Sequence, residues 1–193
     1  MFAYGSRSSV CIGNASPESE GQRQLKLHED GAVLQIKWVS VGGSEKLVAA
    51  AENSVQVWNL DGSLLCLCWA LPQPPASFDT TRPFYASCIA AVGPADSLFV
   101  GASSGDIFIF TASGEMVSFN RTHRAHDSCV TAMAANDIAA PSTLVSADSS
   151  GTIRVWDAFS MSSTVEIAGG GFACAFVFYA SVPPWVSNLN FWC

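Results

Sequence analysis

The sequence is poor in charged residues, and poorest in basic ones. Only 13% of its 193 residues are Asp, Glu, Lys or Arg, and 9 basic residues stand against 16 acidic ones, for a net charge of −7. The densest basic stretch holds only Arg121, Arg124 and two histidines. Because nucleic-acid binding relies on clustered Lys and Arg, we expect no nucleic-acid partner. Low charge together with 11% aromatic residues also argues against a disordered chain.

Two kinds of membrane-directed segment are also missing. The chain does not open on a charged stretch followed by an apolar run, so we expect no signal peptide. The apolar run Ile167–Val182 spans 16 residues, contains three consecutive glycines and is followed by two prolines. A membrane-spanning helix needs about 20 apolar residues, so we expect no membrane span.

Cysteine pairs of the Cys-x-x-Cys type are absent. The seven cysteines are odd in number and irregularly spaced, which favours reduced thiols in a cytoplasmic protein over a disulfide framework. Cys66 and Cys68 would share one face of a strand, since strand side chains alternate with period two. Leu65 and Leu67 would fill the other face, so we expect both thiols to be buried.

Helical periodicity is lacking as well, whereas a strand–turn–strand unit occurs three times. Residues 46–59, 98–111 and 144–157 align without a gap, at offsets of 52 and 46 residues. Each unit has an apolar triplet, a small polar turn, and alternating apolar residues that end near an aromatic. Asn53, Gly105 and Gly151 occupy the turn position where a hairpin favours a positive φ. The pairs Val55/Val57, Ile107/Ile109 and Ile153/Val155 would each point to one face.

Further strand-like runs flank these units. They precede all three units at residues 34–39, 88–92 and 129–133, and follow the first two at 64–69 and 116–119. Four short strands repeated every 46 to 52 residues are typical of β-propeller blades. The sequence therefore predicts an all-β fold, an incomplete β-propeller of about three four-stranded antiparallel blades.

The third unit resembles the WD40 repeat family. It ends in Val155-Trp156-Asp157 and is preceded by Ala125-His126, whereas residues 57–59 and 109–111 match more weakly. In a typical WD repeat, an Asp directly before the turn Gly joins a His, a Ser/Thr and the Trp in a buried hydrogen-bond network. Ser150 and Ser104 hold that place here, and Asp148 lies two residues earlier. We therefore expect an incomplete network.

Three regions are predicted. Residues 1–24, rich in Ser and Gly, are expected to be a flexible arm. Residues 25–160 hold the WD-repeat blades, at about 25–71, 84–120 and 126–166. Residues 167–193 form an apolar tail that does not follow the repeat. Because three units do not close a ring, we expect a truncated propeller with open edges that favour self-association.

Ser103 is the one candidate nucleophile. Residues 101–105 fit Gly-x-Ser-x-Gly, the pattern of a hydrolase nucleophile elbow, which requires a strand-to-helix turn. The residues that follow, 106–110, have strand character, so we expect Ser103 to lie in a hairpin turn.

Two further motifs have structural alternatives. His123-x-x-His126-x-x-Cys129 has zinc-ligand residue types, but no second cluster completes a tetrahedral set, and we expect an inter-blade loop. Pro72-Gln73-Pro74-Pro75 fits a proline-rich ligand, or a stiff linker between blades. The nearby aromatic residues are either partner contacts or a cover for the seam between blades: Phe78, Phe84 and Tyr85.

We therefore expect no enzyme, no cofactor and no metal. The resemblance to WD40 repeats implies a cytoplasmic scaffold or adaptor for other proteins, in signalling or vesicle-associated complexes. The partner and the partner-binding residues are not indicated. The alternatives are a truncated propeller fragment without independent function, or a serine hydrolase that uses Ser103.

Overall fold

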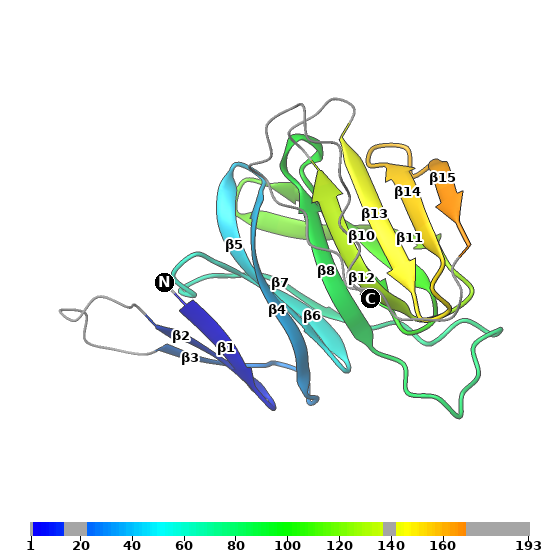
Figure 1. Ribbon diagram of the computed structural model, residues 1–193. Coiled ribbons are helices and arrows are strands. Elements are labelled where there is room, and N and C mark those ends of the chain that lie inside the picture. The colour runs from blue at the N-terminus through cyan, green and yellow to red at the C-terminus, as the bar shows by residue number, and fades with distance from the viewer. Residues whose placement is uncertain (1, 14–22, 137–141, 169–193) are drawn as a thin grey trace.

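The computed structural model describes residues 2–13, 23–136 and 142–168 of the chain. These residues form fifteen β-strands and one short 3-10 turn, with no α-helix among them. The strands pair antiparallel with their neighbours in sequence, in four separate sheets (Figure 1). The predicted all-β class with three four-stranded antiparallel sheets is therefore confirmed.

The four sheets follow one another along the chain. Sheet A contains β1 (Phe2–Ser6), β2 (Ser9–Gly13) and β3 (Arg23–Lys26). Blade B contains β4 (Val33–Val41), β5 (Ser44–Ala51), β6 (Ser54–Asn59) and β7 (Leu65–Ala70). Blade C contains β8 (Ala86–Val92), β9 (Ser97–Ala102), β10 (Asp106–Ser113) and β11 (Met116–Arg124), with the 3-10 turn η1 at Gly93–Ala95. Blade D contains β12 (Val130–Asn136), β13 (Thr143–Asp148), β14 (Ile153–Asp157) and β15 (Ser163–Ile167).

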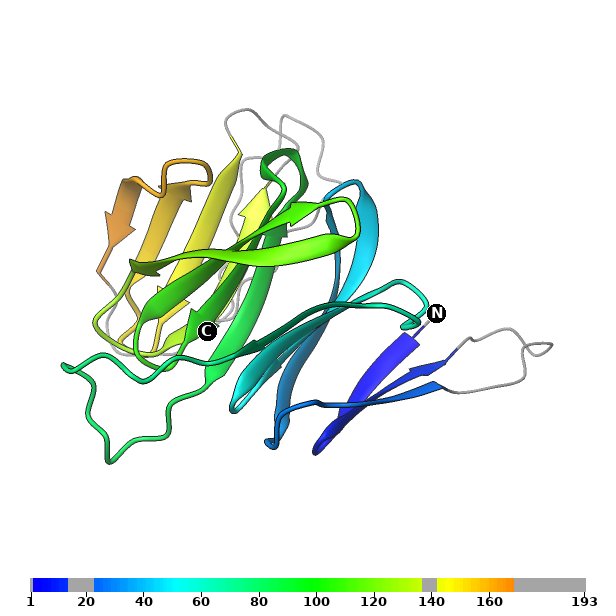
Figure 2. The ribbon, with the colours of Figure 1, turned by 180° about the vertical axis from the view of Figure 1, so that it is seen from behind.

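The sheets stand face to face like the leaves of an open fan, as the two opposite views show (Figures 1 and 2). The first strand of each blade lies at the inner side of the fan, where β8 contacts both β4 and β12. The strand β1 of sheet A lies beside β4 in the same way. This arrangement is an arc of propeller blades.

The period-two alternation of strand side chains explains why the blades are apolar on both faces. Along β5, Leu47 and Ala49 pack into the core shared with sheet A, whereas Val48 and Ala50 pack into the core shared with blade C. Blade C does the same, because Val100 faces blade B and Phe99 faces blade D. Nearly continuous apolar runs therefore follow from two packed faces on each strand.

An aromatic cluster joins the outer strands of blades B and C. Trp69 of β7 stacks on Phe119 of β11 with ring centroids 5.0 Å apart, and it meets Phe108 and Phe110 of β10 edge-on at 4.9 and 5.2 Å. Such pairs contribute about 0.5–1.5 kcal/mol beyond their buried area. The seam is therefore held at its outer edge as well as near the inner strands.

The ungapped alignment of the three turns was wrong by one residue in blade B. Ala50 pairs with Val55, whereas Ala147 pairs with Ile153, so the turn of blade B is one residue shorter. Gly105 and Gly151 have the predicted positive φ, at 93° and 87°, but Asn53 does not. A shorter turn reverses the chain without the left-handed residue that the longer turns require.

Of the flexible arm that we expected at residues 1–24, residues 2–13 and 23–24 instead belong to sheet A, which continues to Lys26. Val10 and Ile12 of β2 pack against Leu47 and Trp58 of blade B. The sequence gives a weak strand signal here because the strands are short and only one face is packed. Pairing with the apolar face of blade B stabilises them.

Two smaller expectations also change. Cys66 is buried but Cys68 is exposed. The pairing of β6 with β7 shifts register between Val57 and Trp58, so Cys66 packs in the core with Leu67 and Trp69 and does not share a face with Cys68. The strand β15 extends to Ile167, so the first residue of the predicted tail belongs to blade D. The rest of that tail, from residue 169, lies outside the described residues.

Candidate interaction site

The connections at one end of the blades form a continuous surface, which we call the loop face. In antiparallel sheets, successive turns alternate between the two ends, so the turn between the second and third strands of a blade shares an end with the connections between sheets. The loop face contains the connections between sheets at residues 27–32, 71–85 and 125–129, and the turns at 52–53, 103–105 and 149–152. The long connection 71–85 extends from the lower end of the fan in Figure 1.

A buried hydrogen-bond network fixes the last of these loops to blade D. The Nε2 atom of His126 lies 2.7 Å from Oγ of Ser146, and its Nδ1 atom lies 3.2 Å from Oδ2 of Asp148. The indole Nε1 of Trp156 donates to the same Oγ of Ser146 at 2.8 Å. All four side chains are buried. The expectation of an incomplete network was therefore wrong.

The position of Asp148 explains this error. Its Oδ1 atom accepts hydrogen bonds from the backbone amides of Ser150 and Thr152, at 2.9 and 3.0 Å, and so shapes the turn from inside. Its Oδ2 atom remains directed at His126. An Asp at the end of β13 therefore serves both the turn and the network, although Ser150 stands next to the turn glycine.

Burial sets the protonation of this network. Desolvation lowers the pKa of His126, although Asp148 opposes the shift. Burial by itself raises the pKa of Asp148, but hydrogen bonds from Ser150 and Thr152 and the neighbouring His126 outweigh it and lower the pKa. At neutral pH the network therefore holds a neutral His126 imidazole beside an ionised Asp148 carboxylate. These side chains stabilise the loop.

Blade C has a different polar cluster at the same place, which the sequence analysis missed. Oγ of Ser104 donates to Oδ2 of Asp106 at 2.7 Å, and Nη1 of Arg124 lies 3.5 Å from Oδ1 of Asp106. Arg124 also donates to the backbone carbonyl of Ser104 at 2.6 Å. The available signal was Asp106, a carboxylate directly after the turn Gly105 at the start of an otherwise apolar strand.

Ser103 lies in the predicted hairpin turn, between β9 and β10. Its Oγ donates to the carbonyl of Pro83 and accepts from the amide of Tyr85, both at 3.0 Å. The hydroxyl thus fastens the segment that leads into β8. The strand-to-helix turn of a nucleophile elbow is not present here.

The three residues of the candidate zinc motif point to different places. The ring of His123 meets Trp156 edge-on at 5.1 Å, His126 lies in the buried network, and Sγ of Cys129 lies 3.8 Å from the hydroxyl of Tyr85. Across the part of the chain that the structure describes, no group of three or more His, Cys, Asp or Glu side chains is placed to hold a metal ion. Nor is any helix in that part long and apolar enough to cross a membrane.

The proline-rich connection lies across the loop face. Pro72 is exposed, Pro74 and Pro75 are half-buried, and the carbonyl of Pro75 accepts a hydrogen bond from the amide of Phe78. Phe78 and Phe84 meet edge-on at 5.6 Å, and Phe84 packs against the core between blades B and C. Of the two interpretations of these aromatic residues, covering the seam is therefore the one that describes Phe84.

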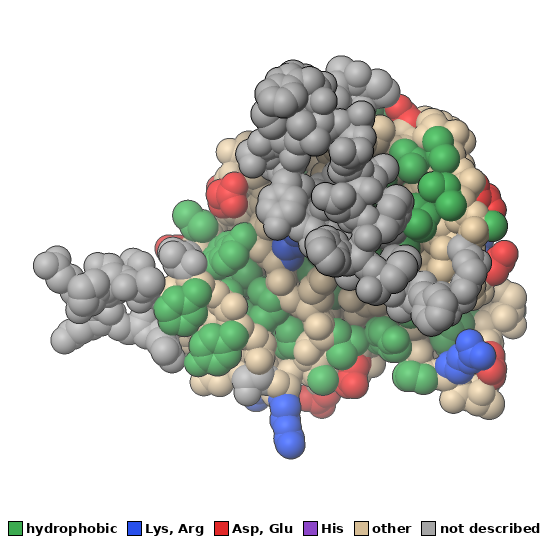
Figure 3. Space-filling view, viewed as in Figure 1, with side chains coloured by type: hydrophobic (Ala, Val, Ile, Leu, Met, Phe, Trp, Pro, Cys, Tyr) green, Lys and Arg blue, Asp and Glu red, His purple; other side chains and the backbone are tan. Residues whose placement is uncertain are grey.

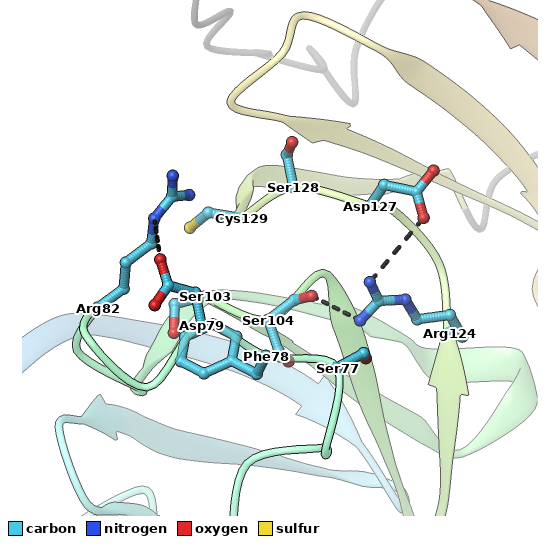
Figure 4. A pocket seen from close by; sticks show the side chains of 10 residues that line it. All are labelled: Ser77, Phe78, Asp79, Arg82, Ser103, Ser104, Arg124, Asp127, Ser128 and Cys129. Carbon is cyan, nitrogen blue, oxygen red and sulfur yellow. Dashed lines mark hydrogen bonds and ion pairs between the residues drawn. The ribbon is translucent and has the colours of Figure 1, made fainter.

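Two pockets open on the loop face, on either side of residues 82–85. The first is polar, with a volume of about 220 Å³ (Figure 4). Arg82 is paired with Asp79 in its wall, and Arg124 with Asp127. Its lining residues come from three connections and the last residue of β11: Ser77, Phe78, Asp79, Arg82, Ser103, Ser104, Arg124, Asp127, Ser128 and Cys129. Its opposed charges suit a polar, electrically balanced contact.

The second pocket has a volume of about 490 Å³ and mainly apolar walls. It lies between the start of β4 and the segment that enters β8. The residues that line it are Leu34, Glu52, Asn53, Pro83, Phe84 and Tyr85. We refer to it as the Leu34 pocket.

The chain is similar in sequence to known WD40-repeat proteins. Residues 117–157 match the family model of the WD40 repeat, described as WD domain, G-beta repeat. The chain is 28% identical over 174 residues to WD repeat domain 54 of Rattus norvegicus, a match that covers 83% of this chain and 51% of the rat protein. The chain therefore spans about half the length of this curated relative.

Solved structures share the fold. A chain of the mitotic checkpoint complex matches with a TM-score of 0.71 and 21% identity, over 96% of this chain and 52% of that one. The WD40 repeats of RRP9 match with a TM-score of 0.56 and 20% identity, over 77% of this chain and 45% of that one. At these identities the likeness concerns the fold alone.

Proposed function

We propose that this WD40-repeat chain is a non-catalytic module that binds other proteins through its loop face. WD40 propellers generally serve as scaffolds for protein interactions. The observation that carries the proposal is that the candidate catalytic and metal-binding side chains serve to hold the backbone in place. Ser103, His126 and Asp148 are all engaged in hydrogen bonds that fix loops and turns. The result is a preformed surface with two pockets, the kind of surface that binds a partner with little ordering cost.

Site-specific photocrosslinking tests the use of the loop face. Ser77 lies in the wall of the polar pocket, whereas Ser113 ends β10 at the opposite end of blade C, and both are exposed. With benzoylphenylalanine at position 77, we expect crosslinks in cells to a defined set of proteins that the same amino acid at position 113 does not capture. Equal capture from both positions would contradict the proposal.

The hydrolase alternative has its own test. A serine-reactive fluorophosphonate probe should leave Ser103 unlabelled, since the hydroxyl already donates to one backbone group and accepts from another. Labelling of the wild-type chain that disappears in Ser103→Ala would contradict the non-catalytic proposal and support a serine hydrolase.

A second candidate is self-association through blade D. Val165 and Ile167 of the outer strand β15 are 48% and 46% exposed, and Val165 pairs with Val155 of β14. The occupant we propose is a second copy of this chain. Two copies would bring eight sheets together, within the range of about four to eight blades in closed propellers.

Light scattering during size-exclusion chromatography tests self-association of the 193-residue chain. A dimer that Val165→Lys converts to a monomer near 20.3 kDa supports it. A wild-type monomer with cooperative unfolding contradicts it and leaves the loop-face proposal in place. Aggregation of the wild-type chain would favour the alternative of a fragment without independent function.

We also propose a cytoplasmic location, in signalling or vesicle-associated complexes. Two observations support it: the resemblance to WD repeat domain 54, and the free state of all five cysteines among the described residues. Cell fractionation followed by membrane flotation tests both parts. Recovery in the cytosol with a fraction that floats with vesicles agrees with the proposal, whereas recovery inside the secretory lumen contradicts it.

A further inference from the structure

The Leu34 pocket has walls that are held in place before any partner arrives. The side-chain amide of Asn53 donates to the carbonyl of Asp30 at 2.5 Å, and the carbonyl of Asn53 accepts from the amide of Leu71 at 2.9 Å. On the other side, Tyr85 makes two hydrogen bonds with Ser103. The Tyr85 amide donates to Oγ of Ser103 and the Tyr85 carbonyl accepts from the Ser103 amide, both at 3.0 Å. A preformed pocket spares the partner the cost of ordering it.

The pocket has exposed apolar side chains in its walls. Leu34 is 45% exposed at the start of β4, and Pro83 is exposed opposite it. Phe84 and Tyr85 are half-buried, with Phe84 anchored in the core between blades B and C. A single exposed leucine is ordinary, but here it lines a concavity of about 490 Å³. That volume lies within the range of ligand pockets, about 300–1,000 Å³.

One carboxylate lines this pocket, and its lining holds no basic residue. Glu52 lines it, and the loop that rests on the Glu52 turn carries Glu29 and Asp30, all exposed. The contact between loop and turn is direct, because Oε2 of Glu52 accepts a hydrogen bond from the amide of Ala32 at 2.9 Å. Figure 3, in which the loop face is the lower edge of the molecule, shows acidic side chains beside hydrophobic ones along that edge, together with one projecting basic side chain.

The basic residues near the pocket are fewer. The carbonyl of Arg7 accepts from the amide of Val33, next to Leu34. Arg82 precedes Pro83 but is paired with Asp79, with Nε and Oδ2 3.6 Å apart. The lining therefore carries one carboxylate and no basic side chain, next to the loop that holds Asp30, in a chain whose net charge is −7. The local field favours a cationic partner.

We propose that the Leu34 pocket binds a basic peptide segment of a partner protein. One aliphatic or aromatic side chain of the segment sits between Leu34 and Phe84, and a neighbouring Lys or Arg faces Glu52 and Asp30. This inference rests on the proposed function and adds the position of the site and the chemistry of its ligand.

The probe is a set of synthetic heptapeptides. The first has a central leucine flanked by two lysines on each side, the second replaces the lysines by glutamates, and the third replaces the leucine by alanine. Binding is followed by the amide shifts of the isotope-labelled protein during titration. We expect the lysine–leucine peptide to shift amides around Leu34, Glu52 and Tyr85, and to bind at least about fivefold more tightly than either other peptide.

Variants along one strand provide the matched comparison. Glu52 and Glu45 are exposed carboxylates at opposite ends of β5. We expect Glu52→Lys to weaken binding about fivefold and Glu45→Lys to leave it unchanged. Glu52→Gln keeps an acceptor for the amide of Ala32 while losing the charge, so a twofold to threefold loss in this variant excludes loop disruption as the cause. Leu34→Asp should abolish the shifts while the unfolding midpoint stays near that of the wild type.

Several outcomes overturn the inference. They are tighter binding of the glutamate peptide, equal losses in Glu52→Lys and Glu45→Lys, and shifts confined to the polar pocket around Arg124. Any of these together with position-specific crosslinks from residue 77 would leave the loop-face function standing and reject only this pocket chemistry. Absence of both peptide binding and crosslinks would reject the function as well.

Discussion

At the scale of single residues, buried polar side chains determine which loops are rigid. His126, Ser146, Asp148 and Trp156 satisfy one another inside blade D, and Ser104, Asp106 and Arg124 do so in blade C. Unpaired buried polar groups cost about 1–3 kcal/mol each, so each cluster stabilises one loop geometry. The Nε2 atom of His123, buried without a hydrogen-bond partner, is an exception.

The Trp156 hydrogen bond should be measurable by comparison with Trp58. Both indoles are buried near the end of the third strand of their blades, but among the described residues only Trp156 donates a side-chain hydrogen bond. We expect Trp156→Phe to lower the free energy of unfolding by about 1 kcal/mol more than Trp58→Phe does. Urea denaturation checks this, and equal losses would show that the indole donor contributes nothing.

Stability should fall in mild acid because of two histidines. Desolvation lowers the pKa of both His123 and His126 below the ordinary 6.5. The unfolded chain therefore binds more protons than the folded chain as the pH falls below about 6.5. The histidine contribution to stability is fully present above that pH and is lost as the pH falls through the folded pKa.

Urea titrations at pH 7.5 and 5.5 measure this loss. We expect a lower free energy of unfolding at pH 5.5, and a smaller difference between the two pH values in His126→Gln and in His123→Gln. An unchanged pH dependence in the double variant would assign the effect to other groups.

At the scale of elements, a hairpin turn of one blade is hydrogen-bonded to the loop that enters the next blade. The carbonyl of Gly105 accepts hydrogen bonds from the amides of Ala125 and His126, at 3.2 and 2.9 Å. The turn of blade C is therefore attached to the loop that enters blade D. A β-carbon at position 105 would clash with the His126 carbonyl, because it would lie closer to that group than van der Waals contact allows. Glycine is therefore required there for space as well as for its positive φ.

Alanine substitution separates these two requirements. Gly43 also has a positive φ, 76°, but nothing lies within 4 Å of an added β-carbon. We expect Gly43→Ala to cost about 1 kcal/mol from backbone strain alone, and Gly105→Ala to cost about 1–3 kcal/mol more from the close contact. Thermal or urea unfolding of the pair gives the difference, and equal costs would rule out the steric contribution.

At the scale of the whole molecule, the described sheets differ in how many of their faces are packed. Blades B and C each lie between two sheets and share a core with both of them. Sheet A shares a core only with blade B, and blade D only with blade C, among the described residues. In arrays whose repeats contact only their neighbours, local stability follows the number of packed interfaces.

Hydrogen exchange should therefore be slowest in the middle of the arc. We expect the amides of the inner strands of blades B and C, β4–β6 and β8–β10, to exchange last, and those of β3 and β15 first, because local opening at the ends exposes fewer buried contacts. Peptide-resolved exchange followed by mass spectrometry checks this order. Uniform rates in all four sheets would mean that the arc opens only as a single cooperative unit.

The sequence by itself determined the strands of blades B and C and the first three strands of blade D, because their period-two apolar pattern and turn residues are local signals. It also determined the turn position of Ser103, since the strand character of residues 106–110 is visible without tertiary contacts. Only the tertiary structure decided the existence of sheet A, the shorter turn of blade B, and the completeness of the His126 network. The Leu34 pocket was decided in the same way, because Leu34, Glu52 and Tyr85 meet only when adjacent blades stack. Each of these features depends on which residues distant in the chain come together, and that information is set by packing between sheets.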